Sequence, residues 1–140
     1  HEKIIFKESF FKKRCLVPVN GYYEWKIING DKIPYFIHLS SLQTMFFAGI
    51  WKFFDKKKFL YKTFSILTKN SNDIISDVHH RMPVIFDLNE GINYIMNDQF
   101  TLKYNFVSKM EDNLEYFPVS KFVNSPTNNS IKCITPISKF

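Results

Sequence analysis

Apolar and polar residues alternate along the first third of the chain in the two-residue period of a half-buried strand. From Tyr22 to Ile28 the alternation places Tyr22, Glu24 and Lys26 on one face and the residues between them on the other. Most of these residues are aromatic or β-branched, which favours a strand over a helix. The pattern therefore predicts a strand that carries one carboxylate among aromatic neighbours.

Turn signals divide the rest of this region into hairpins. Asn29-Gly30 is the strongest short-range hairpin signal, and it predicts a returning strand over residues 34–39. Residues 45–54 and 59–68 form a second aromatic-rich pair, turned by Asp-Lys-Lys-Lys at 55–58. These segments predict an antiparallel meander with few places for a crossover helix.

Shorter elements complete the expectation. A strand closed by proline is predicted at 15–18, a last strand at 117–120, and a short amphipathic helix or basic turn at 7–13. Helical turns are predicted at 73–78, after good N-cap residues, and from a capping-box sequence at Asp87 through Met96. The whole pattern predicts a β-rich α+β fold in one domain, residues 1–140.

Composition adds few constraints. The 140 residues are 45% hydrophobic, which is enough for a core without disulfides. No apolar run is long enough to span a bilayer, so we expect an intracellular protein. Cys15 and Cys133 form no CxxC pair, which argues against a zinc site, and no cofactor is expected. The net charge of +6 suggests an anionic partner, although a lysine-rich codon bias explains it equally well.

The candidate chemistry lies in Val-His-His-Arg-Met-Pro at 78–83, together with Glu24. His79 or His80 can carry a proton near neutral pH, a partly buried glutamate can be tuned to do so, and Arg81 can grip phosphate. An acid–base pair beside a phosphate anchor predicts chemistry on a nucleic acid.

Each residue also has a plainer interpretation. Glu24 could be a solvent-facing strand residue, and a loop histidine is structural more often than catalytic. Trp25 could stack on an unpaired base or belong to the core. A metal site built from both histidines and Asp77 is disfavoured, because neighbouring residues seldom converge on one ion.

Several blocks, in order, are similar to the SOS response-associated peptidase (SRAP) family, also called abasic-site processing proteins. They are Arg-Cys-Leu-Val-Pro at 14–18, Gly-Tyr-Tyr-Glu-Trp at 21–25, Pro-Tyr-Phe at 34–36, Phe-Ala-Gly-Ile-Trp at 47–51, Phe-Ser-Ile-Leu-Thr at 64–68, His-His-Arg-Met-Pro-Val-Ile at 79–85, and Pro-Val-Ser with Val-Asn-Ser-Pro at 118–126. Together they cover nearly the whole chain.

The resemblance implies a β-rich domain with barrel-like sheets that binds single-stranded DNA containing abasic sites, as a monomer, in the cytoplasm and nucleoid or the nucleus. Such proteins remove their initiator methionine and link the new N-terminal cysteine to the abasic sugar as a thiazolidine. Glu24 and His79 match the family's catalytic glutamate and histidine. Trp25, Arg81 and Thr68 match positions near the DNA.

The family's opening Met-Cys-Gly-Arg and later Asn-Ala-Arg segment are absent from these 140 residues, which begin with His1. Neither Cys15 nor Cys133 can replace the N-terminal cysteine, because neither has a free α-amine beside its thiol. We therefore expect a domain without its N-terminal segment, unable to form the crosslink alone. A non-enzymatic binder of single-stranded nucleic acid and an inactive gene fragment stay open as alternatives.

Overall fold

The computed structural model describes residues 12–56, 59–97 and 106–137. The chain divides into two compact units that each draw on three segments. Unit 1 contains residues 1–19, 45–69 and 83–108, and unit 2 contains residues 20–44, 70–82 and 109–140. Strands β6 (Thr68–Asn70) and β7 (Arg81–Pro83) contain two of the five points where the chain passes from one unit to the other.

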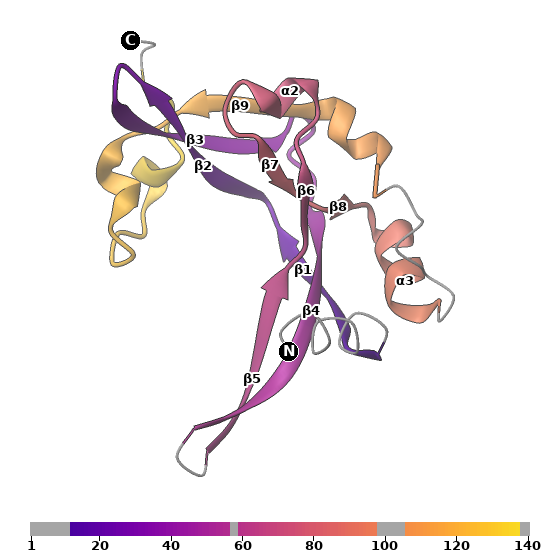
Figure 1. Ribbon diagram of the computed structural model, residues 1–140. Helices are drawn as coiled ribbons and strands as arrows, with labels where there is room; N and C mark the ends of the chain where they lie inside the picture. The colour runs from indigo at the N-terminus through magenta and orange to yellow at the C-terminus, as the bar shows by residue number, and fades with distance from the viewer. Residues whose placement is uncertain (1–11, 57–58, 98–105, 138–140) are drawn as a thin grey trace. The chain divides into compact units, whose positions relative to one another are not determined.

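An antiparallel sheet forms the framework of unit 1. Its order is β1 (Arg14–Val19), β4 (Met45–Lys56) and β5 (Phe59–Ile66), and the short β8 (Ile85–Phe86) also pairs with β4. β4 and β5 form a long hairpin (Figure 1). In the described part of this sheet, β4 and β5 are the only paired strands that are also neighbours in sequence. β1 pairs with β4 although residues 20–44, which belong to unit 2, lie between them in the chain.

Helix α3 (Leu88–Met96) closes the core of unit 1. Asp87 accepts a hydrogen bond from the Glu90 N–H at 2.8 Å, and the Glu90 carboxylate accepts one from the Asp87 N–H at 2.9 Å, which completes the predicted capping box. The helix delivers Tyr94, fully buried, to a cluster of apolar side chains formed by Ala48, Ile50, Val84 and Phe86.

A second antiparallel sheet forms unit 2, with the order β2 (Gly21–Ile28), β3 (Asp31–Leu39) and β9 (Leu114–Pro118). The short helix α2 (Asp73–Ser76) and three 3-10 turns, η1 (Lys109–Asn113), η2 (Lys121–Asn124) and η3 (Ile131–Cys133), complete the described part of this unit. Ile33, Ile37 and Leu39 of β3 are buried, so the central strand supplies much of the apolar interior.

The β2–β3 turn follows directly from its sequence. Asn29 and Gly30 have φ angles of 51° and 87°, the left-handed conformations that a two-residue hairpin needs. Gly21, at the other end of β2, allows a close approach, because a Cβ there would lie 2.7 Å from the Ile37 carbonyl oxygen and 2.3 Å from the Phe36 ring. A side chain at position 21 would therefore force the two strands apart.

The antiparallel, β-rich class predicted from sequence is confirmed, and several boundaries differ. Pro18 lies inside β1 rather than ending it, which an edge strand tolerates because its outward side needs no N–H donor. The strand predicted over 59–68 ends at Ile66, and the chain then begins the separate β6. Helix α2 stops at Ser76, and the last strand starts at Leu114. Of the segment 7–13, residues 7–11 lie outside the described residues.

Candidate active site

Glu24 and His79 face each other within unit 2. Glu24 lies in the middle of β2, and His79 lies in the loop between α2 and β7. The Oε2 atom of Glu24 is 4.0 Å from Nδ1 of His79, and the two side chains keep 25% and 34% of their surface exposed. A carboxylate and an imidazole that are distant in sequence thus converge at a half-buried position, where protons can still exchange with solvent.

The backbone of Arg81 fixes the orientation of the His79 ring. Nδ1 of His79 lies 3.0 Å from the Arg81 carbonyl oxygen, and the Arg81 N–H points at the same nitrogen from 3.2 Å. Nδ1 can therefore donate to the carbonyl or accept from the N–H. When Nδ1 carries the proton, Nε2 is the basic nitrogen of the neutral ring. The His-x-Arg sequence thus holds the imidazole in place through the main chain.

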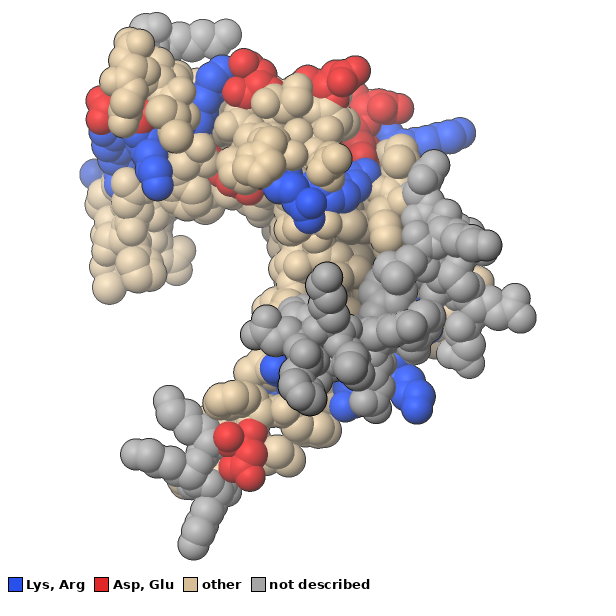
Figure 2. Space-filling model, in the orientation of Figure 1, with Lys and Arg blue, Asp and Glu red and all other residues tan. Residues whose placement is uncertain are grey.

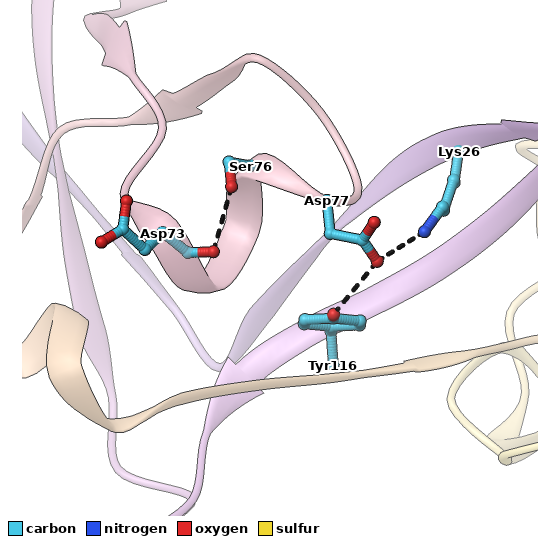
Figure 3. A network of polar contacts seen from close by, with 5 residues as sticks. All are labelled: Lys26, Asp73, Ser76, Asp77 and Tyr116. Carbon is cyan, nitrogen blue, oxygen red and sulfur yellow. Dashed lines mark hydrogen bonds and ion pairs between the residues drawn. The ribbon is translucent and has the colours of Figure 1, made fainter.

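An ion pair also joins the same two segments. Lys26, two residues after Glu24 on β2, donates from Nζ to Oδ2 of Asp77 at 2.5 Å, and Asp77 precedes His79 by two residues. The Tyr116 hydroxyl of β9 donates to the same oxygen at 3.5 Å, as Figure 3 shows. The Lys26–Asp77 pair lies beside the Glu24–His79 pair and ties the His79 loop to the strand.

This contact shifts both titrating groups. The hydrogen bond and the positive charge of Lys26 hold the pKa of Asp77 below its usual range. The same hydrogen bond raises the pKa of Lys26. Both groups thus stay charged across the neutral range, so the ion pair persists at neutral pH.

The Glu24–His79 pair borders a pocket of about 550 Å³ on the surface of unit 2. Its lining combines one carboxylate, one imidazole, an ammonium, an amide and apolar surface: Glu24, Trp25, Ile27, Lys32, His79 and Asn124. The Trp25 indole N–H donates to Oδ1 of Asn124 at 2.9 Å, and 37% of the residue is exposed. Trp25 is therefore a pocket wall rather than a core residue.

Tyr22 lies on the same face of β2 as Glu24, two residues before it. Burial of its hydroxyl, followed by the negative charges of Glu24 and Glu111, raises the pKa of Tyr22 well above its ordinary value. The phenol is neutral at every physiological pH. It thus adds aromatic surface to the Glu24 side of the strand without competing for the proton.

Positive and negative side chains are mixed on the face of unit 2 that Figure 2 shows, with Asp and Glu lying between the Lys and Arg groups. The net charge of +6 is therefore not gathered into a patch of one sign on the drawn face of this unit.

The structure brings together three of the five site residues predicted from sequence. Glu24, His79 and Trp25 line one pocket. Arg81 contacts His79 through its main chain, and the role of its guanidinium in DNA binding stays a prediction. Thr68 belongs to unit 1, and its role also stays a prediction.

Sequence reasoning missed the parts that assemble the site. Asp77 was considered only as a metal ligand, whereas its carboxylate is paired with Lys26; in the described residues no three candidate ligands cluster for a metal ion. Lys32 and Asn124 at the pocket were also missed. The Lys26–Asp77 contact joins residues 51 positions apart, so no local signal could have revealed it.

Residues 1–126 match the sequence model of the SOS response associated peptidase (SRAP) family. This chain is a member of the SRAP family. It is 37% identical over 139 residues to the abasic site processing protein YoqW of Bacillus subtilis, covering 95% of this chain and 62% of YoqW. It is 33% identical over 150 residues to the abasic site processing protein HMCES of Gallus gallus, covering 89% and 44% respectively.

The fold is shared with a solved structure. A protein of Bacteroides thetaiotaomicron superposes with a TM-score of 0.75 at 27% identity, over 94% of this chain and 60% of that one. The SRAP chain thus spans about three-fifths of the length of YoqW and of the Bacteroides protein, and 44% of the length of HMCES. No helix in its described residues is long and apolar enough to cross a membrane.

Proposed function

We propose that this chain carries the acid–base site of an abasic-site processing protein that acts on single-stranded DNA inside the cell. The supporting observation is the 4.0 Å approach of Glu24 and His79 at the border of the unit 2 pocket. Family membership and the names of the relatives, abasic site processing proteins, support an abasic site as the substrate. The proposed nucleophile is an N-terminal cysteine, which these 140 residues do not include.

The proposed reaction starts with the ring-opened abasic sugar. The cysteine α-amine adds to the sugar aldehyde, the resulting carbinolamine loses water to give a Schiff base, and the thiol then adds across the C=N bond to close a thiazolidine. One water is released in total. His79 would protonate the sugar ring oxygen as the ring opens, and Glu24 would transfer protons during formation of the Schiff base.

Glu24 has a second role in this proposal. The α-amine becomes available only after the initiator methionine is removed, and Glu24 would assist that hydrolysis by taking a proton from the attacking water. The protein would thus be a peptidase toward its own first residue. We propose that the crosslink then shields the abasic site during DNA repair.

One other function has specific support. The exposed Trp25 ring and the Lys32 ammonium at the same pocket suit a protein that only binds single-stranded nucleic acid, by stacking and charge. Such a binder needs no proton transfer. The two functions therefore differ in whether Glu24 and His79 matter for a covalent product.

The deciding experiment uses the longer protein in which Met-Cys-Gly-Arg and the following residues precede His1 in frame. Adducts with an abasic oligonucleotide are resolved on a denaturing gel, and binding is followed separately by fluorescence anisotropy. Glu24→Gln and His79→Ala should each slow adduct formation by about 100-fold or more, the usual contribution of a general acid or base, with binding retained.

Two control substitutions match these variants in chemistry. His80 is the adjacent, exposed imidazole, and Glu115 is an exposed carboxylate on β9, so His80→Ala and Glu115→Gln should form adducts at the wild-type rate. If Glu24→Gln and His79→Ala formed adducts as fast as the wild type, the proposed roles would be refuted. An adduct formed by the 140-residue chain alone would refute the N-terminal cysteine as nucleophile.

A further inference from the structure

Lys26 has two carboxyl groups within its reach and bonds to one of them. Glu24 lies two residues before Lys26 on the same face of β2, so their Cα atoms are about 7 Å apart. The flexible four-carbon stem of a lysine can carry its ammonium over that distance. In the structure the Lys26 ammonium instead donates to Oδ2 of Asp77 at 2.5 Å.

The contacts between β2 and the His79 loop follow one spacing. Glu24 and Lys26 are two residues apart on the strand, and their partners His79 and Asp77 are two residues apart on the loop. Figure 3 shows the Asp77 carboxylate reaching from the end of α2 to the Lys26 ammonium. Lys26 is thus directed across to the loop rather than back along its own strand. The Glu24 carboxylate lies 4.0 Å from the His79 ring.

The His79 loop has anchors other than this ion pair. Ile75 is fully buried and Val78 is 6% exposed, so apolar contacts hold the segment on both sides of Asp77. The His79 N–H also donates to the Ile75 carbonyl oxygen at 3.0 Å. The Asp77 side chain is 63% exposed, and ion pairs of such exposed groups add little to the stability of a fold. The direction given to the Lys26 ammonium is therefore the larger consequence of the pair.

We propose that Asp77 is a positioning residue that holds the Lys26 ammonium away from Glu24. Without the negative charge of Asp77, Lys26 turns along the strand and pairs with the Glu24 carboxylate. A carboxylate paired with an ammonium is a weaker proton acceptor, because the positive charge stabilises its ionised form. The inference rests on the proposed function in one respect, that Glu24 transfers protons. It extends that function by naming the residue that keeps Glu24 able to do so.

The first test measures the rate of adduct formation in the longer protein described above. Asp77→Asn should slow the adduct about 5-fold, the effect of one exposed ion pair on an equilibrium, with binding of the oligonucleotide retained. Lys26→Met should react at the wild-type rate, because no ammonium is left to pair with Glu24. The double variant Asp77→Asn/Lys26→Met should recover the wild-type rate. A simple tie between loop and strand cannot give this rescue, since the double variant lacks the tie as well.

A matched control comes from another exposed lysine–aspartate pair of unit 2. Nζ of Lys121 lies 3.6 Å from Oδ1 of Asp31, and both side chains are more than half exposed. Asp31→Asn makes the same chemical change as Asp77→Asn and should leave the adduct rate at the wild-type value. Melting temperatures near that of the wild type show that each variant is folded.

The second test needs no crosslinking and uses NMR of the 140-residue chain. Nuclear Overhauser effects between the ε-methylene protons of Lys26 and the γ-methylene protons of Glu24 should appear in Asp77→Asn and be absent or much weaker in the wild type. Their appearance would show directly that Lys26 turns to Glu24 once the charge of Asp77 is removed.

Three outcomes would overturn the proposal. They are a wild-type adduct rate in Asp77→Asn, equal slowing in Asp77→Asn, Lys26→Met and the double variant, or no contact between Lys26 and Glu24 in the NMR spectra of Asp77→Asn. A wild-type adduct rate in Glu24→Gln would instead refute the proposed role of Glu24. The NMR measurement would then still report where the Lys26 ammonium lies, so the two failures are distinguishable.

Discussion

Replacing Tyr94 by phenylalanine removes one buried hydroxyl and keeps the ring that fills the core of unit 1. The side chain is fully buried, and its hydroxyl donates to the Gly49 carbonyl oxygen at 2.8 Å. The ring also packs at 5.5 Å from Phe86, a contact that the substitution preserves. The variant therefore removes the hydrogen bond between α3 and the middle of β4.

The expected cost follows from the unmet acceptor. Losing a buried hydrogen bond that leaves its partner unsatisfied costs about 1–3 kcal/mol, whereas removing a whole buried ring costs about 3–5 kcal/mol. Tyr94→Phe should thus lower the free energy of unfolding by about 1–3 kcal/mol. Tyr94→Ala should lower it by about 3–5 kcal/mol. Urea denaturation of the 140-residue chain, followed by circular dichroism, measures both.

A matched control is Tyr61→Phe, which removes a hydroxyl from an exposed ring of β5 and should change stability by less than about 0.5 kcal/mol. Alkaline pH gives a second readout. Burial raises the pKa of Tyr94 above its ordinary value of 10, so its contribution is complete below pH 10 and is lost as pH rises through the folded-state pKa. Tyr94→Phe should lack this alkaline loss. A stability equal to that of Tyr61→Phe would refute the reasoning.

Three further predictions concern single groups. Asp87→Ala removes the cap of α3 and should cost about 1 kcal/mol in urea denaturation, and an unchanged midpoint would mean that the capping box is unimportant. Because Lys26 lowers the pKa of Asp77, this pair stabilises the fold above pH 3.8, and the stabilisation is lost as pH falls through the lowered pKa. NMR titration should place the Asp77 midpoint below 3.8, and Lys26→Met should raise the midpoint back toward 3.8. Burial raises the pKa of Cys15 above 9.0. In a Cys133→Ser background, the rate of alkylation by iodoacetamide should therefore rise with pH, with a midpoint above pH 9. A midpoint below pH 9 would contradict the burial of Cys15.

Part of the candidate site could be predicted from the sequence because its signals are local. Alternation along residues 22–28 placed Glu24 and Lys26 on one face of a strand, and the Val-His-His-Arg-Met-Pro sequence at 78–83 marked the segment that holds His79. Resemblance to the family singled out Glu24 and His79 themselves. Nothing local indicated that Asp77 would pair with Lys26 or that Trp25 would bond to Asn124, because these contacts cross the chain by 51 and 99 residues.

The sequence by itself determined the elements whose energetics involve only neighbours. Asn29-Gly30 produced the β2–β3 turn because these residues accept positive φ, and the Asp87 and Glu90 side chains started α3 because they satisfy its free N–H groups. Tertiary structure alone decided that β1 pairs with β4 and β3 with β9. Many strand edges offer the same backbone hydrogen bonds, so the partner is chosen by which apolar faces can be buried together. The approach of the Glu24 carboxylate to the His79 imidazole is likewise a contact between distant segments, which no motif determines.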